Sequence, residues 1–152
     1  MNTEHQPMYD WKDLPWRTIE RHVFKLQKRI YQASQRGDQS MVHKLQRLLM
    51  TSWSAKCLAV RRVTQDNQGK KTAGVDGVKA LSPRQRLALV NILRVDLPVK
   101  PVRRGWIPKP NNPAEQRPLG IPTIFNRAAQ MLAKLALEPE WEARFEPNSY
   151  GF

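Results

Sequence analysis

Apolar side chains recur at helical spacing through the first part of the chain, and this pattern constrains the fold more than any other feature. The first series follows intervals of three and four residues and consists of Trp16, Ile19, Val23, Leu26, Ile30 and Ala33. A second series with the same period, from Met41 through Leu45, Leu48, Ser52 and Ala55 to Ala59, predicts a helix that continues to about Thr64. Gly37 should end the first helix and Asp38 should cap the second, and so short a link predicts an antiparallel helical hairpin.

The rest of the chain predicts two more helices and one pair of strands. Ser82, Pro83 and Gln85 form the pattern of a capped helix that should close at residues 97–98. Thr123 can cap a fourth helix, which Pro139 is expected to interrupt. Short apolar segments at residues 102–107 and 119–121 flank a proline-rich basic loop, which is typical of a β-hairpin. The expected fold is therefore mainly α with a small antiparallel β-hairpin, an α+β class.

Positive charge is concentrated in the middle of the chain. The net charge is +13, and residues 53–134 hold 16 basic and 4 acidic side chains, whereas residues 135–152 carry 1 basic and 4 acidic ones. Such an imbalance favours a polyanionic partner, and nucleic acid is the natural one. The chain shows no apolar run of membrane-spanning length and no signal-peptide pattern at its start, so we expect a cytoplasmic protein without a membrane partner.

Few residues suggest catalysis or metal binding. Cys57 is the only cysteine and lies in an apolar helical pattern, which favours a buried structural thiol. His5, His22 and His43 are widely separated and have no partner at metal-ligand spacing. The glycine- and lysine-rich segment 67–77 predicts a structured loop that could be a solvated turn or a phosphate contact, although its spacing is not that of a P-loop.

One block of motifs resembles the first conserved segment of group II intron reverse transcriptases. It comprises Ile107-Pro108-Lys109-Pro110-Asn111, Arg117-Pro118-Leu119-Gly120-Ile121-Pro122-Thr123, Arg127, Gln130 and Leu137-Glu138-Pro139. Upstream, residues 67–77 resemble the loop of that family ending in Ala-Gly-Val-Asp-Gly, and Leu26-Gln27, Arg29-Ile30 and Leu45-Gln46 resemble its N-terminal extension. Downstream, residues 145–152 resemble the start of the next segment. The chain is thus identified as the N-terminal part of a group II intron reverse transcriptase or maturase.

The resemblance implies roles that composition does not supply. Residues 1–12 are polar and irregular and would be a disordered N-terminus, and the apolar periodicity assigns residues 13–66 to the N-terminal helical hairpin. The resemblance makes residues 67–152 a partial fingers subdomain that stops before the palm. Lys109 and Arg117 match the basic positions associated with the nucleotide triphosphate. Charge clustering nominates the RNA-binding candidates Arg61, Arg62, Lys70, Lys71, Arg103, Arg104 and Arg127.

The same resemblance predicts what this chain lacks. The metal-binding aspartates of the family belong to later segments, so we assign no catalytic residue and no metal ligand, and we expect no polymerase activity from the chain alone. Mg²⁺ and a deoxynucleoside triphosphate are implied for the complete enzyme. The expected partners are group II intron RNA or an RNA template, together with the remaining reverse-transcriptase polypeptide.

The sequence is also compatible with two other functions and with base stacking by two tryptophans. The chain could be a stand-alone RNA-binding remnant or a split subunit that assists intron folding, or, less consistently with its pattern, a helix-turn-helix DNA-binding protein. Arg127, on a helix, could instead be a structural ion-pair partner. Trp53 and Trp106 could stack on bases, with core packing favoured for Trp53 and neither role favoured for Trp106.

Overall fold

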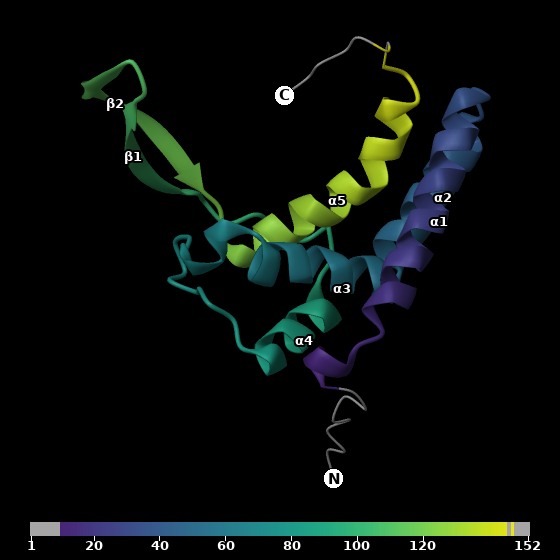
Figure 1. The fold of residues 1–152 in the computed structure, drawn as a ribbon, viewed down its shortest axis with the longest axis horizontal. Coiled ribbons are helices and arrows are strands. Elements are labelled where there is room, and N and C mark those ends of the chain that lie inside the picture. The colour runs from purple at the N-terminus through teal and green to yellow at the C-terminus, as the bar shows by residue number, and fades with distance from the viewer. Residues whose placement is uncertain (1–9, 146, 148–152) are drawn as a thin grey trace.

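The structure, a computed structural model, describes residues 10–145 and residue 147, and most of its regular elements are helices (Figure 1). In chain order they are the 3₁₀ turn η1 (Trp11–Asp13), α1 (Trp16–Gln35), α2 (Gln39–Thr51), α3 (Trp53–Arg61), the π-helical turn η2 (Arg62–Asp66), the 3₁₀ turn η3 (Gln68–Lys71), α4 (Pro83–Ile92), β1 (Arg103–Lys109), β2 (Asn112–Ile121) and α5 (Ile124–Glu142). The two strands form one antiparallel pair. The predicted mainly α fold with a small β-hairpin is confirmed.

Helices α1 and α2 form the expected antiparallel pair, and the link between them is set by local hydrogen bonds. Gly37 has φ +70°, and its N–H donates to the Ser34 carbonyl at 3.0 Å, while the Asp38 N–H donates to Ala33 at 3.0 Å. These two bonds are those of a Schellman motif, which needs a left-handed residue after the helix. The Asp38 carboxylate then accepts from the Met41 N–H at 3.0 Å and caps α2.

The predicted continuous second helix is wrong, because the chain breaks at Ser52. This residue has extended backbone angles, ends α2 and caps α3, with its hydroxyl accepting from the Ala55 N–H at 3.1 Å. The break turns α3 away from α2 (Figure 1). It also leaves Trp53 46% exposed at the start of α3 and Leu48 50% exposed on α2, so the core packing expected for Trp53 is not observed.

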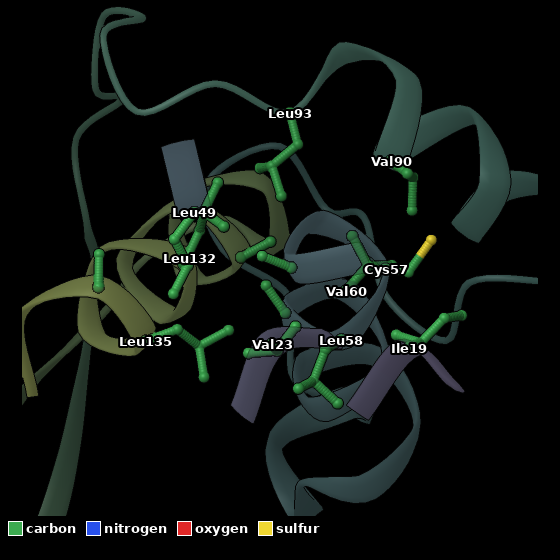
Figure 2. Close-up of a cluster of buried hydrophobic side chains, with 14 of the residues drawn as sticks. Ile19, Val23, Leu49, Cys57, Leu58, Val60, Val90, Leu93, Leu132 and Leu135 are labelled. Carbon is green, nitrogen blue, oxygen red and sulfur yellow. The ribbon is translucent and has the colours of Figure 1, made fainter. Parts of the chain in front are cut away.

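One hydrophobic core joins all five α-helices, and helix α3 lies near its centre (Figure 2). The side chains of Ala55, Cys57, Ala59 and Val60 on α3 have no exposed surface. Burial raises the pKa of the Cys57 thiol to about 12, which keeps it protonated and unreactive at neutral pH. The prediction of a structural thiol agrees with this environment.

A cluster of tryptophan and arginine side chains packs η1 against the π-helical turn that follows α3. Residues 11 and 12 fall in the segment expected to be irregular, yet Trp11 is only 2% exposed and packs edge-on against Trp16 with ring centroids 4.9 Å apart. Gln65 in the π-helical turn accepts from the Trp11 indole N–H at 3.0 Å and from Arg86 at 3.1 Å. Residues 1–9 lie outside the described residues, as does most of the motif at residues 145–152.

Helix α5 continues past Pro139 to Glu142, so the predicted interruption is also wrong. A proline within a helix removes the N–H that would donate to the carbonyl four residues earlier, here that of Leu135. The Gln27 side chain, on α1, donates to this carbonyl at 3.0 Å. A hydrogen bond from another helix therefore replaces the one that Pro139 cannot make.

A buried carboxylate next to this proline forms a second link between α5 and the helical pair. Glu140 is 7% exposed and accepts from the Gln46 amide on α2 at 2.7 Å and from Arg144 at 2.9 Å. Burial alone would raise the pKa of Glu140, but the hydrogen bonds from Arg144 and Gln46 outweigh it and hold the pKa below its ordinary value. The Ser34 hydroxyl also donates to the Glu140 carbonyl at 3.0 Å.

The segment between α4 and β1 and the hairpin itself lie at the edge of this helical body. Helix α4 begins with the predicted capping box between Ser82 and Gln85 but ends at Ile92, earlier than expected. The β1–β2 hairpin projects away from the helices (Figure 1). Within residues 10–145, no helix combines the length and the apolar character required to cross a lipid bilayer.

Candidate nucleic-acid interface

The loop of residues 67–77 is held against the first turn of α5 by a backbone contact at Gly74. A Cβ atom added to Gly74 would lie 2.7 Å from both the N and Cα atoms of Thr123, which is too close for any side chain. Thr123 is the N-cap of α5, and its hydroxyl accepts from the Asn126 N–H at 3.1 Å. Glycine at position 74 thus lets the loop lie directly on the helix start, and the sequence prediction of a structured loop is consistent with this contact.

Arg127 on α5 uses its whole guanidinium group to join the loop to the start of its own helix. Its Nε donates to the Pro122 carbonyl at 3.1 Å, its Nη1 to Gly69 at 2.9 Å and its Nη2 to Thr72. Burial lowers the pKa of Arg127, and Asp76 partly offsets that effect. RNA binding by Arg127 stays a prediction. In the structure its guanidinium group binds main-chain carbonyls of its own chain.

Two more of the predicted RNA-binding cations also donate to main-chain carbonyls. Arg103, at the start of β1, donates through Nε to Ala73 at 2.9 Å, and Lys70 donates to Gln65 at 2.9 Å. Together with Arg127, these residues hold the path of the loop, and we refer to Lys70, Arg103 and Arg127 as the loop clamp. Clustered cations in the sequence therefore have a structural role that charge counting could not separate from RNA binding.

Arg61 is likewise engaged within the fold. Its guanidinium lies 4.7 Å from the centroid of the Trp16 ring and pairs with Glu20 at 3.4 Å and Asp66 at 3.5 Å. Its neighbour Arg62 is half-buried at the start of the π-helical turn. Stacking and two carboxylates leave Arg61 less able than a free surface arginine to receive a phosphate.

The remaining predicted cations are more accessible. Lys71, Arg104 and Arg117 are exposed, and none of the three forms an ion pair within the part of the chain that the structure describes. These side chains can approach a polyanion without first breaking an internal salt bridge.

The hairpin register places the two predicted nucleotide-binding residues on the same face. Ile107 is opposite Arg117, and strand alternation along β2 puts Glu115 on the same side as Arg117. The register shifts between Pro108 and Lys109, which brings Lys109 opposite Asn112. Lys109 forms an ion pair with Glu115 at 2.6 Å, which places its ammonium group on this side, and Lys109 and Arg117 are both exposed.

A shallow pocket separates the loop from the middle of α5. It has a volume of about 330 Å³ and is lined by Val63, Asn67, Gly69, Arg127, Gln130, Met131 and Lys134. Two of these residues are cationic and none is acidic, so the pocket suits an anionic or neutral polar group. Across residues 10–145, no three His, Cys, Asp or Glu side chains gather in a way that could hold a metal ion.

Comparison with known families identifies the chain from its first helices. Residues 11–93, which extend from η1 to the end of α4, match the family described as the N-terminal domain of reverse transcriptase. The chain belongs to this family. The reverse-transcriptase N-terminal domain observed here therefore comprises the helical pair, α3, the loop and α4, and the hairpin and α5 follow it.

Curated relatives extend the similarity into the hairpin and α5. The chain is 34% identical over 149 residues to Maturase-like protein 1 of Euglena gracilis, covering 93% of this chain and 31% of that protein. It is 41% identical over 117 residues to Protein YkfC of Escherichia coli K12, covering 72% of this chain and 30% of the relative. Group II intron-encoded protein LtrA of Lactococcus lactis is 43% identical over 53 residues, which are 35% of this chain and 9% of LtrA.

These comparisons confirm the prediction of an N-terminal part of a group II intron reverse transcriptase or maturase. The chain spans about a third of the length of the maturase-like protein and of YkfC. The division at residue 66 into a hairpin and a fingers unit stays a prediction. The structure shows one core that includes residues from both sides of it, among them Leu45 and Leu132.

Helix α1 carries a basic stripe that was not among the predicted RNA-binding residues. Arg17, Arg21, Lys25 and Lys28 are all exposed and follow at intervals of four, four and three residues. They occupy the helix side opposite the buried residues Ile19, Val23, Leu26 and Ile30, and none of them is in an ion pair within the described residues. The signal was present in the sequence, since the helical period that identified the apolar face also fixes what lies on its reverse.

Proposed function

We propose that this chain binds RNA through a surface of exposed cations, as the N-terminal part of a group II intron reverse transcriptase or maturase. The observation that carries the proposal is the α1 stripe of Arg17, Arg21, Lys25 and Lys28. Four cations in a row on a single helix are spaced to follow successive phosphates, and none of the four is in an ion pair within residues 10–145. Similarity to a maturase-like protein and to a group II intron-encoded protein favours RNA over other polyanions.

The salt dependence of RNA binding tests this proposal. Replacing all four stripe residues with glutamine should weaken binding and flatten the plot of log affinity against log salt, by roughly 0.7 per lost contact to a single strand. A matched pair of single variants tests position rather than total charge. Arg21→Gln removes an exposed cation of the stripe, whereas Arg94→Gln removes an exposed cation that is paired with Asp96 at 2.6 Å. If both change the slope equally, overall charge rather than the stripe accounts for binding.

We further propose that the hairpin contributes nucleotide contacts in the complete enzyme. Lys109 and Arg117 share one face, and fixed cations of this kind neutralise charge on a transferred phosphate. Mg²⁺ and a deoxynucleoside triphosphate belong to that complete enzyme, and this chain would supply the two cations to the phosphates. Since Lys109 is paired with Glu115, that carboxylate competes with a phosphate for the Lys109 ammonium group.

The test of the nucleotide contacts uses the full-length protein with its remaining polypeptide. Lys109→Ala combined with Arg117→Ala should greatly reduce nucleotide incorporation while RNA affinity changes little. Glu115→Gln provides the reverse control, since it frees Lys109 and should lower the KM for nucleotide. Equal loss of incorporation and of RNA binding in the double variant would contradict this separation of roles.

The second candidate function is a stand-alone RNA-binding remnant or a split subunit that assists intron folding. In that case RNA binding would persist without any other polypeptide, and adding the missing region as a separate chain would restore incorporation. Assaying the chain with and without that region distinguishes the two arrangements.

A further inference from the structure

The second face of the hairpin carries an exposed aromatic ring that the nucleotide face does not use. The register and strand alternation place Arg104, Trp106, Pro108, Gln116, Pro118 and Gly120 together on this face. Lys109, Glu115 and Arg117 lie on the opposite side. The two faces therefore have separate residues and can take separate ligands.

Trp106 is accessible on this face. Its side chain is 56% exposed, it is opposite Pro118 across the ladder, and its diagonal neighbour Gly120 has no side chain that could cover the ring. Both strands are exposed along nearly their whole length, and the hairpin stands away from the helices (Figure 1). A large aromatic side chain usually lies mostly buried in a fold, where burial of its ring stabilises the protein. Trp106 gains little of this stabilisation because its ring is mostly exposed.

The charge around Trp106 is favourable to a nucleic acid. Arg104 is exposed on the same face, two residues before Trp106, and takes part in no ion pair within the described residues. The hairpin has a single carboxylate, Glu115, which lies on the other face and is neutralised by Lys109. An aromatic ring, an adjacent unpaired cation and a hydrogen-bonding amide at Gln116 are the parts of a site that stacks a base and contacts its phosphate.

We propose that the Trp106 face of the hairpin binds single-stranded RNA by stacking one unpaired base on the indole ring while Arg104 contacts the backbone phosphate. This inference rests on the proposed RNA binding and adds a distinct site to it. The bases of a duplex are already stacked on one another, so the site selects unpaired strands. It is also independent of the α1 stripe, which contacts phosphates whether or not bases are exposed.

Equilibrium binding to three fluorescein-labelled RNA probes tests the proposal. The probes are an unstructured 12-nucleotide oligouridine, a duplex of the same length, and a strand of the same length in which the bases are absent. Trp106→Leu should weaken oligouridine binding about 5- to 10-fold, at the low end of the effect of removing a stacking partner, while Trp106→Phe stays within about two-fold. Neither variant should alter binding of the duplex or of the base-free strand.

Trp141→Leu is the matched control, because this tryptophan is 47% exposed but lies on α5 between Glu138 and Glu142. It should leave binding of every probe unchanged. A direct readout comes from wild-type protein containing 5-fluorotryptophan: oligouridine should shift the ¹⁹F resonance that disappears in Trp106→Phe, and the base-free strand should not. This measurement needs no destabilising variant.

The outcomes separate this inference from the broader function. If the wild-type protein binds oligouridine and Trp106→Leu binds it equally well, or loses the base-free strand to the same extent, stacking at Trp106 is refuted while RNA binding stands. If the wild-type protein binds none of the three probes, the proposed function fails and this inference fails with it.

Discussion

Replacing Gln46 with leucine should destabilise the protein in a way that depends on pH. The Gln46 amide donates to the buried carboxylate of Glu140 at 2.7 Å and to the Ala136 carbonyl at 3.3 Å. Leucine has a similar size and no donor, so Glu140 would keep only Arg144 as its partner. A hydrogen bond to a charged group contributes about 1.5–3 kcal/mol, so we expect a loss of about 2 kcal/mol. For a chain of this size that lowers Tm by about 4–8 °C.

The pH dependence follows from the sign of the Glu140 shift. Its folded-state pKa is lowered from 4.5, so the stabilisation it provides is present above pH 4.5 and is lost as pH falls through the folded-state pKa. Gln46→Leu removes one of the bonds that lower this pKa. The difference in unfolding free energy between wild type and variant should therefore be largest near pH 7 and should shrink below about pH 4.5.

Urea unfolding followed by circular dichroism at pH 7 and at pH 3 measures this difference. Gln32→Leu is the control, since Gln32 is an exposed glutamine on α1 and its replacement should change stability by less than about 0.5 kcal/mol. Combining Gln46→Leu with Glu140→Gln removes the charge and should recover part of the loss. A destabilisation of the same size at both pH values would refute the assignment of the effect to the Glu140 carboxylate.

Three further outcomes are expected. Gly74→Ala should destabilise the protein by about 1–3 kcal/mol because the new Cβ atom would meet the Thr123 backbone. The control Gly77→Ala lies at φ +71° with open space around it and should cost only about 1 kcal/mol. Equal melting temperatures for the two variants would contradict the close contact at Gly74. Arg127→Lys should speed amide hydrogen exchange of the loop at residues 69–74, since a single ammonium cannot reach three carbonyls; unchanged protection would show that the loop does not depend on the guanidinium. Cys57, whose pKa is raised to about 12, should react with a thiol reagent at pH 8 only after denaturation, and rapid labelling of the native protein would show that the site opens.

Local sequence predicted the features whose partners lie nearby in the chain. Asp38, Ser82 and Thr123 cap helices by bonds that span three residues, so their identity and spacing were sufficient. The break at Ser52 was missed because the apolar period continues across it. A serine within an apolar helical pattern does not by itself say whether it caps a helix or lies within one.

Features that depend on distant residues could not be read from the sequence. Pro139 is a reliable helix breaker unless another donor serves the carbonyl that it orphans, and that donor, Gln27, is 108 positions before Leu135. Lys70, Arg103 and Arg127 looked like RNA contacts because composition records their charge but not the carbonyl groups they meet. In contrast, the α1 stripe was predictable from the sequence, because its four cations lie on the helix side opposite the predicted apolar face.

The loop clamp has a consequence for which substitutions the protein tolerates. Each of its bonds to the loop ends on a main-chain carbonyl, at Gly69, Thr72 and Ala73. Every residue has a main-chain carbonyl group, so the loop clamp fixes the backbone path of the loop without requiring particular side chains at most loop positions. Positions such as 68, 71 and 72 are free to diversify, and a library that varies them while keeping Gly74 should yield mostly folded proteins with altered ligand preferences.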